Sequence, residues 1–145
     1  KYLLEFERGG GASAPGLLES IGDLKRFAAE AGADDLMLPV LREGGAGCIT
    51  ACSNIAPDLA QAVYSEYRKN GDDGDVEQWH EKLSNVRKII SGYPLVPSLK
   101  AMVARHNNDD AWFNMRPPIL AMDDAQTQKL YQEYDGAGLR LPQAA

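Results

Sequence analysis

Apolar residues in the second half of the chain recur three and four positions apart, the spacing of one buried face of an α-helix. The pattern is clearest between Asp75 and Ser91, where the repeating residues are Val76, Trp79, Leu83, Val86 and Ile90. Similar spacing and helix-start signals predict further helices over residues 36–43, 58–70, 98–106 and about 123–134. The chain is therefore expected to be predominantly helical.

Residues 48–52, with the sequence CITAC, do not follow the helical spacing. They are small or apolar and show no polar alternation, which is typical of a strand covered on both faces. Prolines predict extended chain at residues 93–97 and 116–118, because a proline disfavours helix at the residue before it. A short helical piece is predicted around Trp112.

Residues 32–57 combine these patterns into a recognisable unit. A glycine turn with two carboxylates is followed by an apolar helix, a glycine-rich turn, the strand and a polar loop that ends in proline. This order is typical of the strand–helix–strand repeat of an α/β barrel. The predicted organisation has a poorly defined segment at 1–31 (a candidate strand, a Gly-rich loop and a short helix), the unit at 32–57 and a helical region at 58–145.

Composition and charge narrow the class of protein. Hydrophobic residues make up 44% of the 145, and fifteen Lys and Arg against twenty-one Asp and Glu give a net charge of −6. These values fit a globular domain and argue against a nucleic-acid partner, which needs a basic face. No apolar run approaches the roughly 20 residues of a membrane span, and the first residues do not resemble a signal peptide.

The cysteines and histidines offer little chemistry. Cys48 and Cys52 lie four apart in the predicted strand, too far for a disulfide, and are expected to be small buried residues in a reducing, cytoplasmic compartment. His80 and His106 are the only histidines, on separate predicted helices, and are expected to be structural or solvent-facing. We therefore predict no metal centre and no histidine-based triad.

The adjacent carboxylates Asp34 and Asp35 are the strongest candidates for function. On a helix they would point about 100° apart, so they would not converge on one metal ion; either could cap the following helix. The alternative is hydrogen bonding to a polar substrate at the carboxyl end of a strand, where barrel active sites lie. The cluster at 44–47 lacks the Lys-Ser/Thr of a phosphate loop and is interpreted as a turn.

The stretch GADDLMLPVLREGGAGCITACSNIAPDLAQAVY resembles the dihydrodipicolinate synthase and N-acetylneuraminate lyase family, which are class I aldolases on a (β/α)8 barrel. The resemblance rests on a Gly-x-Asp-[Asp/Glu] turn after the seventh strand, a Gly-Gly-x-Gly turn before the eighth, and an Asn-x-x-Pro loop. It extends over about residues 32–142. It implies an α/β fold consisting of the last strands of a partial TIM-type barrel and a C-terminal helical bundle.

The chain departs from this family where the catalytic lysine should be. The segment at 16–23, GLLESIGD, is the only counterpart of the sixth-strand motif, and it places Leu18 at the lysine position. Leucine has no amine to form a Schiff base with a keto acid. The segment before Gly32 looks too short for both a helix and a strand. Two explanations are open: a truncated or rearranged gene product, or a sequence that joins separate parts of a longer chain.

The resemblance implies a pyruvate-dependent lyase without a catalytic residue of its own, inactive alone, using no cofactor. Its partners would be a keto acid or aldehyde substrate and further copies of the chain. The alternative is a non-catalytic helical oligomerisation or interaction module. The substrate-binding residues that the resemblance implies are Gly32, Asp34, Asp35, Ile49, Thr50 and Ala51.

Overall fold

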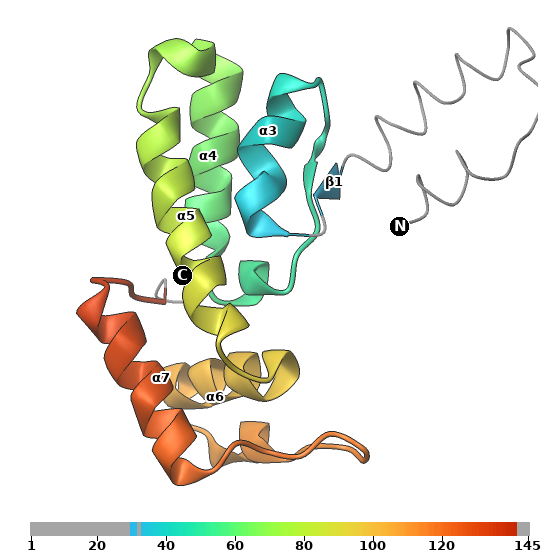
Figure 1. The fold of residues 1–145 in the computed structure, drawn as a ribbon, viewed down its shortest axis with the longest axis vertical. Coiled ribbons are helices and arrows are strands. Elements are labelled where there is room, and N and C mark those ends of the chain that lie inside the picture. The colour runs from blue at the N-terminus through green and yellow to red at the C-terminus, as the bar shows by residue number, and fades with distance from the viewer. Residues whose placement is uncertain (1–29, 32, 142–145) are drawn as a thin grey trace, which may run out of the picture.

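The computed structural model describes residues 30–31 and 33–141. Helices α3, α4 and α5 stand side by side at one end of the molecule, and α6 and α7 form the other end (Figure 1). The elements, with η for 3₁₀ helices, are β1 (Glu30–Ala31), η1 (Asp34–Leu36), α3 (Met37–Arg42), β2 (Gly47–Cys48), η2 (Cys52–Asn54), α4 (Pro57–Asn70), η3 (Gly71–Asp73), α5 (Val76–Ser91), α6 (Leu95–Asn107), η4 (Asp110–Phe113) and α7 (Asp124–Gly136).

The strand–helix–strand unit is present near the start of the described chain. Strands β1 and β2 pair in parallel, with Glu30 opposite Gly47 and Ala31 opposite Cys48, and α3 connects them. Strand β1 therefore directly precedes Gly32. The expectation that the segment is too short for both a helix and a strand also concerns residues 1–29, which lie outside the described residues. The short helix expected in this segment was predicted for residues 23–31, and its last two residues, Glu30 and Ala31, form β1 instead.

The second strand is shorter than predicted. Only Gly47–Cys48 pairs, and Cys52 already begins η2. Polar side chains explain the early turn: the backbone N–H of Ser53 donates to Thr50 Oγ1 at 3.3 Å, and Asn54 Nδ2 donates to the Ala51 carbonyl at 2.9 Å. Such local bonds satisfy groups that a strand ladder would otherwise use.

Neither aspartate of the turn caps a helix. The N-cap positions of η1 and α3 are Ala33 and Leu36, and neither makes a side-chain capping bond. Asp58, expected to cap α4, lies inside its first turn instead, because the helix begins at Pro57. Proline suits that position because its missing N–H has no helical partner there.

The helical region largely follows the apolar spacing. Four of the five stripe residues in α5 are fully buried, and Trp79 packs against the core. The exception is α6, which begins at Leu95, before the predicted start at Ser98. Only Pro94 stays extended, and Pro97 falls within the first turn, where a proline is tolerated. The prediction of extended chain at 93–97 is therefore wrong for residues 95–97, which are helical.

The two ends of the molecule share one hydrophobic core. Tyr134 of α7 is buried, and its hydroxyl donates to the Ile55 carbonyl, just before α4, at 3.2 Å. Burial raises the pKa of Tyr134 to about 12, so the hydroxyl keeps its proton at neutral pH. None of the described helices is both long and apolar enough to cross a membrane.

Candidate functional site

The candidate site forms where the β1–β2 unit meets η1 and η2. Thr50, two residues beyond β2, donates its hydroxyl proton to Asp34 Oδ1 at 2.5 Å. Asp34 begins η1, shortly after β1. Two of the residues that the sequence singled out are therefore joined at the carboxyl ends of two parallel strands.

The Asp34 carboxylate is buried rather than presented to solvent. Its residue is only 1% exposed, and Oδ2 has no hydrogen-bond partner among the described residues. A buried acceptor without a donor costs free energy, typically 1–3 kcal/mol. Asp34 is therefore placed to orient the Thr50 hydroxyl, and its second oxygen retains capacity for one more donor.

Ser53 extends the pair into a hydroxyl cluster. Its hydroxyl lies 2.9 Å from Thr50 Oγ1. Since Thr50 gives its proton to Asp34, its oxygen accepts from Ser53. The sequence interpretation missed Ser53, although its position three residues after Thr50 is the spacing of a side-chain-stabilised turn.

Cys52 lies in the same region and is buried, as predicted. Burial, followed by the negative charge of Asp34, raises the pKa of its thiol to about 12, and Arg87 of α5 opposes the shift. A protonated thiol is a poor nucleophile at neutral pH. The cluster can thus hold and orient polar groups, but it contains no activated nucleophile.

The other predicted site residues are placed differently. Asp35 is exposed, Ala51 is half-buried, and Ile49 is 73% exposed. Gly32 lies outside the described residues. The structure therefore brings together Asp34 and Thr50, and leaves Asp35 and Ile49 on the surface.

Of the two histidines, His80 lies beside η1, where it interacts with the Asp35 backbone. His80 on α5 is half-buried, and burial lowers its pKa, with the charge of Glu77 opposing. His106 is exposed at the end of α6. Within the described part of the chain, no cluster of three His, Cys, Asp or Glu side chains could hold a metal ion.

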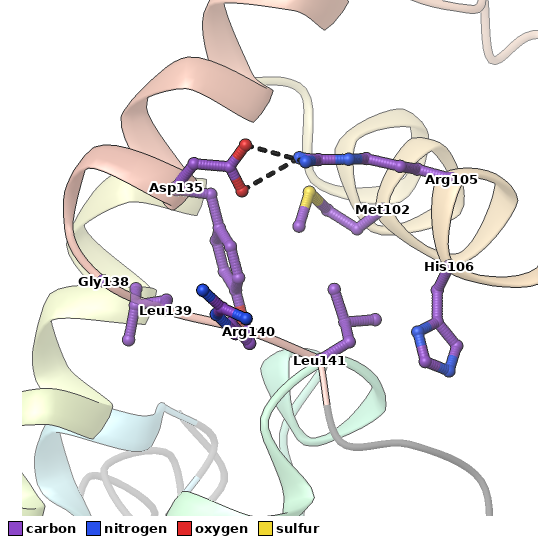
Figure 2. Close-up of a pocket in the computed structure, with 9 residues that line it drawn as sticks. Met102, Arg105, His106, Asp135, Gly138, Leu139, Arg140 and Leu141 are labelled. Atoms are coloured by element: carbon purple, nitrogen blue, oxygen red, sulfur yellow. Dashed lines mark hydrogen bonds and ion pairs between the residues drawn. The ribbon is translucent and has the colours of Figure 1, made fainter.

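A cavity lies elsewhere, between α6, α7 and the residues that follow α7 (Figure 2). It has a volume of about 640 Å³ and is lined by Met102, Arg105, His106, Asp135 and Arg140, among others. Arg105 and Asp135 form a bidentate ion pair at this cavity, with Nη1–Oδ1 and Nη2–Oδ2 distances of 3.1 and 2.7 Å. None of the predicted site residues lines this cavity.

Both the sequence and the fold match known proteins. A sequence model of the Dihydrodipicolinate synthetase family matches residues 18–135. An uncharacterized DapA-like lyase of Chloroflexus aurantiacus is 30% identical over 92% of this chain, and one of Thermofilum pendens is 46% identical over 54%. The crystal structure of dihydrodipicolinate synthase from Thermotoga maritima superposes with a TM-score of 0.63 at 22% identity, over 74% of this chain.

The chain matches only part of each relative. The matched regions are 42% of the C. aurantiacus lyase, 26% of the T. pendens lyase and 35% of the T. maritima enzyme. Most of the length of these proteins therefore has no counterpart in the present sequence.

Proposed function

We propose that this chain, which belongs to the dihydrodipicolinate synthetase family, supplies one side of a class I aldolase-like active site. We call this side the wall; it is formed by residues 32–57, which correspond to the seventh and eighth strands of the family's barrel. The observation that carries this proposal is the Asp34–Thr50 hydrogen bond at the carboxyl ends of parallel strands. Active sites of (β/α)8 enzymes lie at that end of the barrel. The substrate would be a small keto acid or aldehyde.

We divide the proposed contacts with the two substrates among the residues of the wall. The backbone of Ile49, Thr50 and Ala51 would lie beside the keto acid, while Gly32 and the exposed Asp35 would face the polar part of the second substrate. Asp34 holds the Thr50 hydroxyl in one orientation. The proton of this hydroxyl goes to Asp34 and its oxygen accepts from Ser53, so its role is to hold the turn after β2 in place and not to bind the substrate directly.

The chain alone is proposed to be inactive in Schiff-base chemistry. Leu18 occupies the position where the family has its lysine, and leucine cannot form an imine. Incubation with pyruvate followed by borohydride should leave the mass at 15.8 kDa. A family enzyme that carries the lysine, treated in parallel, should gain a pyruvyl adduct; an adduct on the present chain would contradict the proposal.

A graft tests the wall itself. Residues 32–57 of this chain would replace the matching segment of a lysine-containing family enzyme. The folded graft should retain measurable turnover, and Thr50→Val within the graft should lower it more than Thr50→Ser, which keeps the hydroxyl. A graft that folds and forms the pyruvate adduct but never turns over would show that this segment is not a working wall.

A non-catalytic interaction module is the second candidate. It is favoured by exposed apolar residues in the helical region, namely Leu95, Val96, Trp112, Ile119 and Leu120. Exposed apolar surface of this kind is common at protein–protein contacts. Tight self-association in sedimentation experiments, abolished by Trp112→Ser and without any effect of keto acids, would favour this candidate over the wall.

A further inference from the structure

We propose that the cavity between α6, α7 and the residues that follow α7 binds a small organic anion, namely a monocarboxylate with a short apolar tail (Figure 2). The cavity lies apart from the wall, since none of the wall's residues lines it. The inference therefore goes beyond the proposed function and does not depend on it.

The side chains at the cavity carry more positive than negative charge. Arg105 and His106 reach it from α6, and Arg140 reaches it from the segment after α7 (Figure 2). Among the described residues that line the cavity, Asp135 is the only acid. With histidine counted as neutral, two guanidinium groups and one carboxylate leave a charge of +1. A positive cavity in a chain with a net charge of −6 favours an anionic ligand.

The two arginines differ in their surroundings. Arg105 is held by its bidentate ion pair with Asp135 and by the ring of Tyr131, whose centroid lies 4.7 Å from the guanidinium carbon. The pKa of Asp135 is lowered, mainly by its hydrogen bonds with Arg105 and to a smaller extent by the charge of Arg140. Arg140 thus lies near this pair, yet no described residue accepts a hydrogen bond from its guanidinium. Its donors are therefore available to a carboxylate, which arginine binds in bidentate fashion.

The buried residues at the cavity present apolar surface. Met102 and Tyr134 are at most 1% exposed, and Leu139 is 9% exposed. The Tyr134 hydroxyl is already bonded to the Ile55 carbonyl, which leaves the ring to contact a ligand. The volume of about 640 Å³ is typical of small-molecule sites, which combine apolar walls with a few polar groups. A ligand with an anionic head and an apolar tail matches both parts of the cavity.

The charge balance selects the head group of the ligand. One guanidinium without a described partner matches one carboxylate. A phosphate monoester carries about −1.5 to −2 at pH 7, so part of its charge would lack a partner beside Asp135. Hexanoate combines a single negative charge with an apolar tail, and it serves as the probe.

The test titrates the full chain with hexanoate while the amide signals are followed by NMR spectroscopy. Three other probes each lack one feature: 1-hexanol has no charge, acetate has no tail, and inorganic phosphate has neither a carboxylate nor a tail. We expect saturable shifts at residues 102–106 and 134–141 with hexanoate, and affinities about tenfold lower or weaker still for the other probes. Shifts that do not saturate or that lie elsewhere on the chain would overturn the proposal, as would another probe binding as tightly as hexanoate.

Arginine variants locate the anionic head. Arg140→Gln should weaken hexanoate binding about tenfold, because it removes the guanidinium without a described partner. Arg116→Gln makes the same change at an exposed arginine outside the cavity and should leave the affinity unchanged. Circular dichroism checks that both variants are folded. Equal affinities of the two variants would overturn the proposal.

An aspartate variant should change the affinity in the opposite direction. Asp135→Asn releases the donors of Arg105 and raises the charge of the cavity from +1 to +2, so hexanoate should bind several-fold more tightly. Asp124→Asn removes a carboxylate from the first turn of the same helix, outside the cavity, and should leave the affinity unchanged. If the ion pair only held the two helices together, its loss would not strengthen binding. An unchanged or lower affinity of Asp135→Asn would therefore overturn the proposal.

Discussion

At the scale of single residues, the decisive feature is the buried contact between Asp34 and Thr50. The sequence predicted both residues as site candidates, but assigned the carboxylate either to a helix cap or to direct substrate contact. It lies instead behind the Thr50 hydroxyl, with one oxygen unpartnered among the described residues. Burial of this kind depends on α5 packing against η1, which residue spacing within 32–57 does not reveal.

Removing the Thr50 hydroxyl should destabilise the fold. Thr50→Val removes the hydroxyl that donates to Asp34 Oδ1, so this buried carboxylate loses a hydrogen bond and the free energy of unfolding should fall by about 1–3 kcal/mol. Urea denaturation measures the change. Thr50→Ser keeps the hydroxyl and should lose far less, and equal losses in the two variants would show that the methyl group, not the hydrogen bond, matters.

Cys52 should make stability sensitive to alkaline pH. Its pKa is raised to about 12 from an ordinary value of 9.0, mainly by burial, so the folded chain holds a proton that the unfolded chain releases. This stabilisation is fully present below about pH 9 and is lost as the pH rises toward 12. The free energy of unfolding of Cys52→Ala should therefore fall less steeply with pH over that window than that of the parent chain.

At the scale of elements, α5 shows what sequence periodicity predicts well. Its apolar stripe predicted both its span and its buried face, and α4 and α7 were predicted to within a few residues. Periodicity failed where local chemistry dominates. Because of its prolines, the segment before Ser98 was predicted to be extended, although α6 begins at Leu95. The hydroxyls of Thr50 and Ser53 form a local turn, so the second strand ends earlier than predicted.

Substitutions on the two faces of α5 should differ sharply. Leu83→Ala opens a cavity at a fully buried position and should reduce the free energy of unfolding by about 2–5 kcal/mol. Gln78→Ala, on the exposed face of the same helix, should change it by less than about 0.5 kcal/mol. Thermal or urea unfolding followed by circular dichroism compares them; similar losses would mean that α5 is not packed as described.

At the scale of the whole molecule, the helical region and the strand–helix–strand unit share one hydrophobic core. The core joins residues from η2 and α3 to α7, and Tyr134 bonds to the Ile55 carbonyl across 79 positions of sequence. No periodic pattern predicts so distant a bond. The resemblance indicated the family of the fold, whereas the buried connections between its parts required the structure.

The bond from Tyr134 should matter for local order near the site. Tyr134→Phe should lower the free energy of unfolding by about 1 kcal/mol and speed hydrogen exchange at residues 53–55. Tyr131 lies in α7, like Tyr134, and its hydroxyl donates to the Ala101 carbonyl of α6. Tyr131→Phe serves as the control. It should leave exchange at 53–55 unchanged, and faster exchange there in both variants would mean general loosening.

The contact between Tyr134 and Ile55 links the last helix to the proposed substrate wall, although the two lie far apart in sequence. Ile55 directly follows η2, whose Ser53 bonds to Thr50. A shift of α7 would therefore be transmitted through one carbonyl and two hydroxyls to the proposed substrate wall. Sequence drift in the C-terminal helix could change which substrates the wall accepts while every residue of the wall stays the same.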